Sequence, residues 1–267
     1  MIRKNPRMTA RQMKAKLSCI KRWSVRRIQN TLLQNCDLPS RHAAKKPFLS
    51  AAMKAKRLEF ATNHSTWSVA KWRTVMFSDE SWFELWFGGR FARVRRPRGS
   101  NRFDPKFTCK TVKHPQKQMV WGCFSWAGRG RLAFLDKGDT MNQHSYLAIL
   151  KEKLQPAMRH AKTTRFLQDG APCHRARAVK DWLAVKDMNV MDWPGNSPDL
   201  NPIENMWNWM KAKLCDRPPP SNLAKLRKEV SKLWCERTSV EYCRNLVRSM
   251  PNRMAMVMAS GREMTKY

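Results

Sequence analysis

The hydrophobic positions near the N-terminus recur at helical intervals. Val25, Ile28 and Leu32 are three and four residues apart, which places them on one face of a helix that Ser24 can cap. The opposite face of this predicted helix carries polar side chains of the kind that contact bases and phosphates in DNA. These side chains are Arg26, Arg27, Gln29 and Asn30.

Another helix is predicted just before this one. Thr9 followed by Gln12 has the capping-box pattern and opens a helix that runs through about Leu17. Two short helices with a brief turn, the second of them polar and basic, indicate a helix-turn-helix. An ordinary basic helical hairpin has the same pattern and stays open as an alternative. Residues 37–50 have the character of a linker, and a further helix is predicted over 51–63.

From Trp72 onward, short β-rich runs alternate with helical stretches. The predicted strands cover 73–78, 81–87, 91–94, 119–126, 132–135, 165–168 and 189–193, with Gly88-Gly89 as the turn before the third. The predicted helices cover 142–159, 176–185, 202–214 and 222–248. Strands first, then alternation of strand and helix, indicate an α/β domain with a mixed sheet. We therefore expect a small all-α module in residues 1–50 and an α/β domain in residues 51–267.

The balance of charge points to a polyanionic partner. The chain carries 53 Lys and Arg residues against 20 Asp and Glu residues, a formal net charge of +33 over 267 residues. A compact protein of this charge repels itself unless a polyanion neutralises it, and nucleic acid is the natural partner. A solvated basic surface, as in ribosomal proteins, is the alternative. The longest uncharged stretch, 118–128, is too short to cross a bilayer, so a membrane or secreted protein is disfavoured.

Three acidic residues stand where chemistry is expected. Asp79 and Asp169 each follow a predicted strand, and Glu204 lies in the first turn of a predicted helix. Sites in open α/β sheets form outside the carboxyl ends of the strands, so the three carboxylates can converge there. Carboxylate oxygens suit Mg²⁺, and a pair of such ions can act on one phosphodiester. The pattern thus predicts a metal site beside bound DNA.

Each of these acids also has a purely structural explanation. Asp79 can end a strand in a turn, and Asp169 is followed by glycine, which is a turn signal. Asn201 resembles an N-cap, a proline follows it, and Glu204 completes a capping box. His174 is close to Asp169 in the chain, and a place beside the scissile phosphate and a packing role are both open for it.

Four strings surround these acids: VMFSDESWF, QMVWGCFSWAGRG, FLQDGAPCHRA and WPGNSPDLNPIENMW. They resemble the Tc/mariner superfamily of DDE transposases, in particular its nematode-type branch. Thirty-four residues lie between Asp169 and Glu204, which is the spacing typical of that branch. Upstream, RQMKAKL, SVRRIQNTL, KKPFLS and KRLEFATNHSTWSVAKW resemble the second helix-turn-helix of the family and its linker. The resemblance extends from about Asn5 to the end of the chain.

The resemblance implies an RNase H-like catalytic core that moves DNA by cut-and-paste transposition with two divalent ions, Mg²⁺ or Mn²⁺. Asp79, Asp169 and Glu204 match the catalytic triad of the family and are expected to be its metal ligands. Metal-activated water is expected to cleave a phosphodiester at the transposon end. The freed 3′-OH then attacks target DNA, typically at a TA dinucleotide. Both steps are phosphoryl transfers, so no external energy source is needed.

The resemblance also implies the partners and the location of the protein. We expect double-stranded DNA at the transposon ends and at the target, two copies of the chain paired on those ends, and a nuclear protein. Expected DNA contacts beyond the predicted helix at 25–32 are Lys45, Lys46, Arg93, Arg95, Arg96 and Arg98. For the four arginines, nuclear import and a solvated basic segment are the alternatives.

Family members usually carry a first helix-turn-helix ahead of the second. This sequence opens at about the start of the second module, so we expect the first module to be missing, and with it much of the specificity for transposon ends. The leading hypothesis is a catalytically competent transposase of reduced end specificity. A catalytically idle DNA-binding remnant of such a transposase is the alternative, and a generic RNase H-like nuclease fits the three acids but not the strings.

Overall fold

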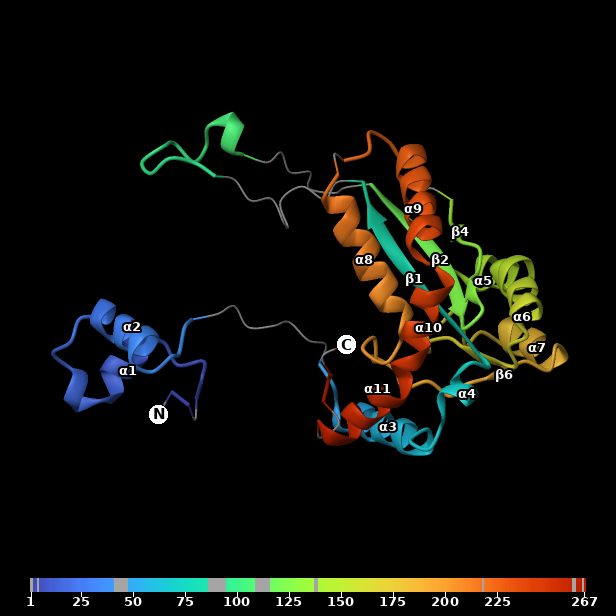
Figure 1. The fold of residues 1–267 in the computed structure, drawn as a ribbon, viewed down its shortest axis with the longest axis horizontal. Helices are drawn as coiled ribbons and strands as arrows, with labels where there is room; N and C mark the ends of the chain where they lie inside the picture. The colour runs from blue at the N-terminus through green and yellow to red at the C-terminus, as the bar shows by residue number, and fades with distance from the viewer. Residues whose placement is uncertain are drawn as a thin grey trace. The chain divides into compact units, whose positions relative to one another are not determined.

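The computed structural model describes residues 2–3, 5–40, 48–85, 95–108, 116–136, 139–217, 219–260, 263–265 and 267. The chain divides into two units, Met1–Lys46 and Pro47–Tyr267. In the described residues, the first unit is helical, whereas the second combines a sheet with helices (Figure 1).

The first helix of the first unit, α1 (Ala10–Lys16), begins with the predicted capping box. The Thr9 hydroxyl accepts a hydrogen bond from the Gln12 backbone N–H, and the Gln12 side chain accepts one from the Thr9 backbone N–H. These two bonds satisfy backbone donors that the start of a helix leaves without a partner. A short 3-10 turn, η1 (Ser18–Ile20), follows α1.

The second helix, α2 (Val25–Gln34), has one apolar and one polar face, as predicted. The Ser24 hydroxyl accepts a hydrogen bond from the Arg27 backbone N–H at 3.1 Å and caps the helix. Ile28 is buried, and so is Met13 of α1, with which α2 is in contact. The four polar side chains of the other face are all exposed: Arg26, Arg27, Gln29 and Asn30.

The second unit is built on one mixed, six-stranded sheet of order β3-β2-β1-β5-β6, with β4 paired to β2. The strands are β1 (Val75–Glu84), β2 (Lys117–Ser125), β3 (Gly128–Arg129), β4 (Ala133–Phe134), β5 (Arg165–Leu167) and β6 (Asn189–Val190). β1 pairs antiparallel with β2 but parallel with β5, and β5 pairs parallel with β6. The predicted mixed sheet is confirmed.

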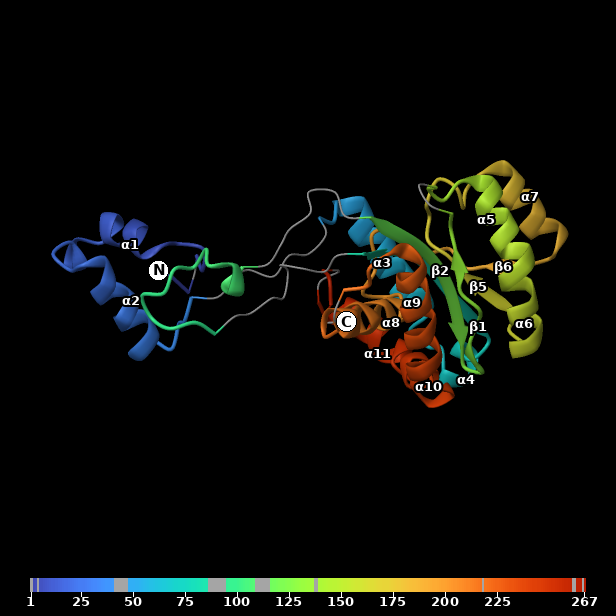
Figure 2. The ribbon, with the colours of Figure 1, turned by 90° about the horizontal axis from the view of Figure 1, so that it is seen from above.

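Helices cover both faces of this sheet, as Figure 2 shows. One face carries α5 (Gln143–Ile149), the π-helical turn η3 (Leu150–Leu154), α6 (Gln155–Ala161) and α7 (Arg177–Val185). The other face carries α3 (Ala51–Asn63), α8 (Ile203–Cys215), α9 (Leu223–Arg237), α10 (Val240–Arg248) and α11 (Met250–Ala259). A short helix, α4 (Val69–Trp72), precedes β1, and η2 (Pro105–Phe107) lies in the segment 95–108. No described helix is long and apolar enough to span a membrane.

β1 runs without a break through Asp79. The predicted end of a strand at 78 and the start of the next at 81 are therefore wrong. Its pairing with β2 continues from Phe77 opposite Phe124 to Glu84 opposite Lys117, so backbone hydrogen bonds hold the polar stretch 78–81 in the strand. The predicted turn at Gly88-Gly89 and the predicted strand at 91–94 lie outside the described residues.

The helical stretch predicted over 222–248 consists of two helices, α9 and α10, and a further helix, α11, follows beyond the predicted range. α9 ends at Arg237, and the Ser239 hydroxyl caps α10 by accepting from the Tyr242 backbone N–H at 3.1 Å. α11 begins with a proline in its first turn, where the missing N–H costs no hydrogen bond. β3 is also absent from the prediction, and β6 is shorter than the predicted 189–193. Together α8, α10 and α11 bury an apolar core against β1 and β2.

Candidate active site

β1 and β5 bring two of the three predicted acids to the same place. Their parallel pairing sets Phe77 opposite Leu167, and Asp79 and Asp169 each come two residues after that pair. Neighbouring strands are about 4.8 Å apart, so the two acids lie near one another where β5 ends. The Ser78 hydroxyl donates a hydrogen bond to the Leu167 carbonyl at 3.0 Å and ties the two strands together there.

α8 brings the third acid, Glu204, to this point. The Asn201 side-chain amide donates to the Ser78 carbonyl at 3.2 Å, which fastens the start of α8 to β1 beside Asp79. Trp207, one turn further along α8, is buried against the sheet. The three acids therefore come from a strand, a strand end and a helix start that are tied to one another directly.

The predicted capping box at α8 is wrong. The helix begins at Ile203 without a side-chain cap. The Asn201 backbone N–H donates to the Pro198 carbonyl at 3.1 Å, so this donor is not available to the Glu204 carboxylate. The Asn201 side-chain oxygen lies 3.5 Å from the Ile203 N–H, a long contact. Glu204 faces Asp79 instead, which removes the purely structural explanation of this residue.

Asp79 and Glu204 form a close pair of like charges. Burial raises the pKa of Asp79 well above its usual value, and the neighbouring carboxylates, Glu204 first, raise it further. Burial also raises the pKa of Glu204, although the charge of Lys211 and a hydrogen bond with the Asp79 side chain oppose this rise. Two carboxylates that interact in this way repel each other when both are ionised, and a bound cation offsets that repulsion.

Asp169 is the accessible member of the group, with a side chain that is 47% exposed. Burial of the rest of its surface raises its pKa, but hydrogen bonds outweigh this effect and lower the pKa overall. Its Oδ1 atom lies 2.7 Å from Nδ1 of His174 and accepts from the Ala171 backbone N–H at 2.9 Å. The pKa of Asp169 is thus shifted downward, whereas the pKa of Asp79 is shifted upward.

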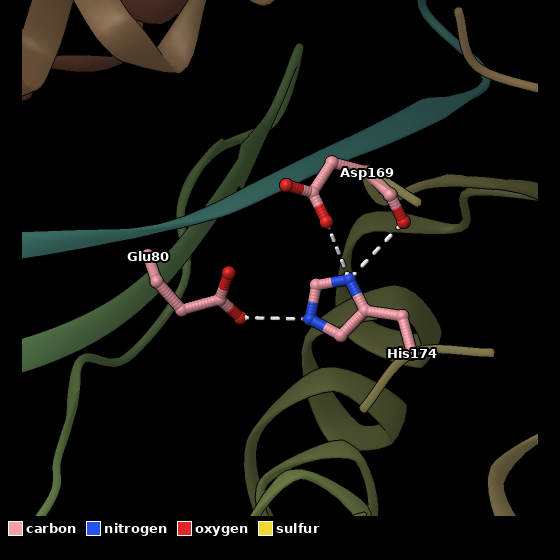
Figure 3. Close-up of side chains that lie close together, drawn as sticks. All are labelled: Glu80, Asp169 and His174. Carbon is pink, nitrogen blue, oxygen red and sulfur yellow. Dashed lines mark hydrogen bonds and ion pairs between the residues drawn. The ribbon is translucent and has the colours of Figure 1, made fainter. Parts of the chain in front are cut away.

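His174 connects Asp169 to Glu80 (Figure 3). Its Nε2 atom lies 3.2 Å from Oε1 of Glu80. Burial of the imidazole lowers the pKa of His174, but the two carboxylates outweigh burial and raise it to about 10. The ring is 3% exposed and stacks on Tyr146 with 4.0 Å between ring centroids.

Glu80 and Tyr146 were not expected at the site. Glu80 follows Asp79 in β1, and successive residues of a strand face opposite sides of the sheet. Asp79 therefore faces α8, while Glu80 faces the side of the sheet covered by α5 and α7, where Tyr146 of α5 and His174, just before α7, lie. Asp79 and Glu80 are adjacent in the string FSDES, but that they face opposite sides of the sheet can be inferred only once both are placed in one strand.

Three of these groups, Glu80, Asp169 and His174, have ligand atoms within 4.8 Å of one another. Both nitrogens of His174 already contact carboxylates, so this group satisfies itself without a metal ion. The acids Asp79, Asp169 and Glu204 offer only oxygen donors. Lys211 acts on Glu204, and His174 and Arg175 act on Asp169, whereas Asp79 is buried beside other carboxylates. Oxygen donors of this kind fit Mg²⁺ or Mn²⁺.

A buried ion pair anchors the loop that leads into α8. Arg57 of α3 donates two hydrogen bonds to the Asp199 carboxylate, each of 2.8 Å. Arg253 of α11 donates to the Asp199 carbonyl and to Oδ1 of Asn205, both at 2.6 Å. The Asp199 side chain thus connects this loop to α3.

The structure describes seven of the ten residues that the sequence predicts to contact DNA. Arg26, Arg27, Gln29 and Asn30 share the exposed face of α2, and Arg95, Arg96 and Arg98 are exposed in the segment 95–108. Lys45, Lys46 and Arg93 lie outside the described residues. The polar face of α2 is therefore available to a partner.

Comparison with known proteins agrees with this geometry. The DDE superfamily endonuclease family matches residues 74–227, and a transposase helix-turn-helix family matches residues 1–66. The Tcb1 transposase of Caenorhabditis briggsae is 34% identical over 245 residues, which cover 91% of this chain and 88% of that protein. The Tc1 transposase of Caenorhabditis elegans is 33% identical over 238 residues, which cover 88% of this chain and 85% of that protein.

Solved structures of the Mos1 mariner transposase share the fold. Its strand transfer complex has a TM-score of 0.83 at 19% identity and matches 99% of this chain and 77% of that chain. Its catalytic domain alone has a TM-score of 0.65 at 19% identity and matches 84% of this chain and 100% of that chain. The predicted RNase H-like α/β core and the preceding helix-turn-helix are confirmed. The family matches and the nematode relatives show that this chain belongs to the Tc/mariner superfamily of DDE transposases and is a DNA transposase.

Proposed function

We propose that Asp79, Asp169 and Glu204 are the catalytic residues of this transposase and that they hold two divalent cations, Mg²⁺ or Mn²⁺. The close approach of Asp79 and Glu204 beside Asp169 supports the proposal. The three carboxylates repel one another, so their grouping does not by itself stabilise the fold. It suits cations that bind next to DNA, in a protein whose net charge is +33. Mos1 transposase complexes with Mg and with Mn have been solved on the same fold.

Bound divalent cations supply activation of the attacking oxygen and stabilisation of the leaving oxygen in phosphoryl transfer. The chain holds the three carboxylates in position. Asp79 is fixed inside β1, Asp169 lies at the open end of β5, and Glu204 is held by the buried side of α8. Water attacks phosphorus at the transposon end, the bond from phosphorus to the 3′-oxygen breaks, and a 3′-OH is released. That 3′-oxygen then attacks a target phosphodiester, so each step exchanges one phosphorus–oxygen bond for another.

We infer that residues 1–50 bind DNA and that residues 51–267 carry out the chemistry. A helix with an exposed basic and amide-bearing face, such as α2, suits the major groove of double-stranded DNA. The basic side chains Lys45, Lys46, Arg93, Arg95, Arg96 and Arg98 belong to the same proposal as phosphate contacts. The proposal includes two copies of the chain on paired transposon ends and a nuclear location, where chromosomal DNA is found.

The substitution Asp79→Asn tests the catalytic site. It removes one carboxylate at nearly constant volume, so we expect cleavage of a labelled duplex carrying the end of the element to fall by at least about a hundredfold. DNA binding should stay salt-sensitive and nearly unchanged, because the proposed DNA contacts lie elsewhere. The control is Asp181→Asn in α7, an exposed acid whose ion pair with Arg177 is 3.7 Å long. That variant should cleave like the wild type.

The assay is run with Mg²⁺ or Mn²⁺ and with EDTA. Cuts that need both the metal and Asp79 would support the proposed site. Wild-type cleavage rates in Asp79→Asn would show that the assignment is wrong. Binding without cleavage by the unmodified chain would identify the catalytically idle DNA-binding remnant instead.

A further inference from the structure

The two oxygens of the Asp169 carboxylate have different surroundings. Oδ1 receives both the Ala171 backbone N–H, at 2.9 Å, and Nδ1 of His174, at 2.7 Å. No donor among the described residues bonds to Oδ2, and Figure 3 shows the second oxygen pointing away from the imidazole ring. One oxygen is thus used to fix the carboxylate, while the other is left for a ligand.

The His174 ring is itself fixed on three sides. Nδ1 lies 3.1 Å from the Asp169 carbonyl as well as near its carboxylate. Nε2 contacts Glu80 on β1, and Tyr146 stacks on the ring face. The Tyr146 hydroxyl donates to the side chain of Gln168 at 2.6 Å, so the stacking partner is also held. A ring held in this way can keep a flexible carboxylate in one rotamer.

We propose that His174 is a positioning residue for Asp169: it holds Oδ1, so that Oδ2 is presented to the metal site, and Glu80 holds the opposite side of the imidazole. This inference rests on the proposed function, because it takes Asp169 to be a metal ligand. It goes further by assigning Glu80 and His174, which bind no metal themselves, a part in metal affinity. Residues that orient metal ligands in this manner typically change metal affinity by about 10- to 100-fold when replaced.

The arrangement favours positioning over direct ligation by His174. A metal ion among Glu80, Asp169 and His174 would have to replace the hydrogen bond that the ligating ring nitrogen already makes to a carboxylate. It would also have to enter a region where the imidazole is 3% exposed and covered by Tyr146. The exposed oxygen of Asp169, in contrast, faces away from that region.

Two variants of His174 separate positioning from packing. His174→Asn places an amide N–H near the position of Nδ1, whereas His174→Gln places one near Nε2. Both lose the ring that stacks on Tyr146, so the loss of packing is matched. The readout is the apparent dissociation constant for Mn²⁺, measured by electron paramagnetic resonance of the free ion, with circular dichroism to confirm folding. We expect the Gln variant to bind Mn²⁺ at least about tenfold more weakly than the wild type, and the Asn variant to recover most of this loss.

Equal Mn²⁺ affinities in the Asn and Gln variants would overturn the positioning role. Glu80 offers a second pair that leaves His174 in place, for the case in which a His174 variant does not fold. Glu80→Gln keeps an oxygen acceptor for Nε2, whereas Glu80→Leu removes it, so we expect the Leu variant to bind Mn²⁺ more weakly than the Gln variant. The reverse order, or a complete loss of affinity in Glu80→Gln, would show that Glu80 is itself a ligand and would overturn the inference.

Asp79→Asn in the same Mn²⁺ titration distinguishes a failure of the proposed metal site from a failure of the positioning role of His174. If it binds Mn²⁺ as the wild type does, the proposed metal site is wrong and His174 has no such role. If it weakens binding while the two His174 variants stay alike, the metal site stands and only the positioning role is overturned.

Discussion

Asp199 lies in the loop before α8, and its counter-ion, Arg57, is fully buried. Besides its two hydrogen bonds from Arg57, its Oδ2 accepts from the Thr265 backbone N–H at 2.8 Å. Burial raises the pKa of Asp199, but the hydrogen bonds and the Arg57 charge outweigh this and lower it overall. A single carboxylate thus connects α3, the loop before Glu204 and the C-terminal segment.

Asp199→Asn tests how much this carboxylate stabilises the fold. We expect it to lower the free energy of unfolding by about 3–5 kcal/mol at pH 7, because it takes the counter-charge from a buried guanidinium. Asp192→Asn, an exposed acid seven residues earlier, should change the free energy by less than about 0.5 kcal/mol. Urea unfolding measures both variants.

The difference in the free energy of unfolding between the wild type and Asp199→Asn should depend on pH. Because folding lowers the pKa of Asp199 below the ordinary value of 3.8, its contribution is fully present above that value and is lost as the pH falls through the folded pKa. The difference in free energy between wild type and Asp199→Asn should therefore shrink below about pH 4. A difference of equal size at pH 3 and pH 7 would contradict the assignment.

At the scale of elements, α8 approaches the sheet where β2 has a glycine. Gly122 pairs with Asp79 across β1 and β2. A Cβ atom at this position would lie 2.7 Å from Cη2 of Trp207, which is closer than atoms can approach. The absence of a side chain at Gly122 therefore sets how closely the helix that carries Glu204 can pack beside Asp79.

Gly122→Ala is expected to push α8 outward. We predict a loss of about 1–3 kcal/mol in the free energy of unfolding and a loss of cleavage activity of more than about tenfold, since Glu204 moves away from Asp79. Adding Trp207→Phe removes the clashing atoms and should restore part of both. Gly130→Ala is the control: its Cβ would clash with Cys123 Sγ at 2.4 Å, so it should cost stability without moving α8.

Full activity in a folded Gly122→Ala protein would show that the contact between Trp207 and Gly122 does not position Glu204. Failure of Trp207→Phe to compensate would mean that the strain is relieved elsewhere, for instance at Leu132, whose side chain would lie 3.1 Å from the new Cβ.

The elements show where sequence reasoning succeeds and where it fails. Local signals, such as the Thr9–Gln12 box and the spacing of Val25 and Ile28, predict α1 and α2 correctly because caps and amphipathic faces are local. The continuity of β1 through the polar stretch 78–81 is not predicted, because the pairing that maintains the strand comes from β2, about forty residues away. The break between α9 and α10 is marked by the Ser239 cap and the start of α11 by Pro251, and these local signals are not used in the prediction of one helical stretch over 222–248.

The site, too, contains residues that the sequence predicts and contacts that it does not. Asp79, Asp169 and Glu204 can be singled out from the sequence, because Asp79 and Asp169 each come shortly after the apolar run of a strand and Glu204 lies in the first turn of a helix. The contacts of His174 with Glu80 cannot, because they require knowing which face of β1 each residue occupies. The capping box at Glu204 fails because the Asn201 backbone N–H donates to the Pro198 carbonyl, while the Asn201 side-chain amide is bonded to Ser78 of β1.

At the scale of the whole molecule, the charge of +33 is divided over two units. In the first unit, the exposed arginines of α2 stand beside an exposed glutamine and an exposed asparagine. A surface of this composition combines phosphate binding with the capacity to read base edges. The second unit holds the acids, so binding and chemistry can be tested separately.

Changing Arg26 and Arg27 together to Ala tests the DNA-binding role of α2. If each contacts a phosphate, DNA affinity should fall and the slope of log affinity against log salt concentration should decrease by about 2. Fluorescence anisotropy at several salt concentrations measures both. The control changes two exposed lysines, Lys180 of α7 and Lys186 directly after it, to Ala and removes the same charge. An equal effect in both pairs, or unchanged affinity in the arginine pair, would speak against recognition through α2.

The uninterrupted course of β1 restricts how the length of this chain can vary. Inserting or deleting one residue between Phe77 and Asp79 would exchange the faces of every residue that follows in the strand, so that Glu80 would meet α8 and Asp79 would meet His174. Inserting two residues would keep the faces but would displace Asp79 by about 6.6 Å along the strand, beyond the reach of Glu204. This stretch can therefore accept substitutions, whereas insertions and deletions in it are excluded.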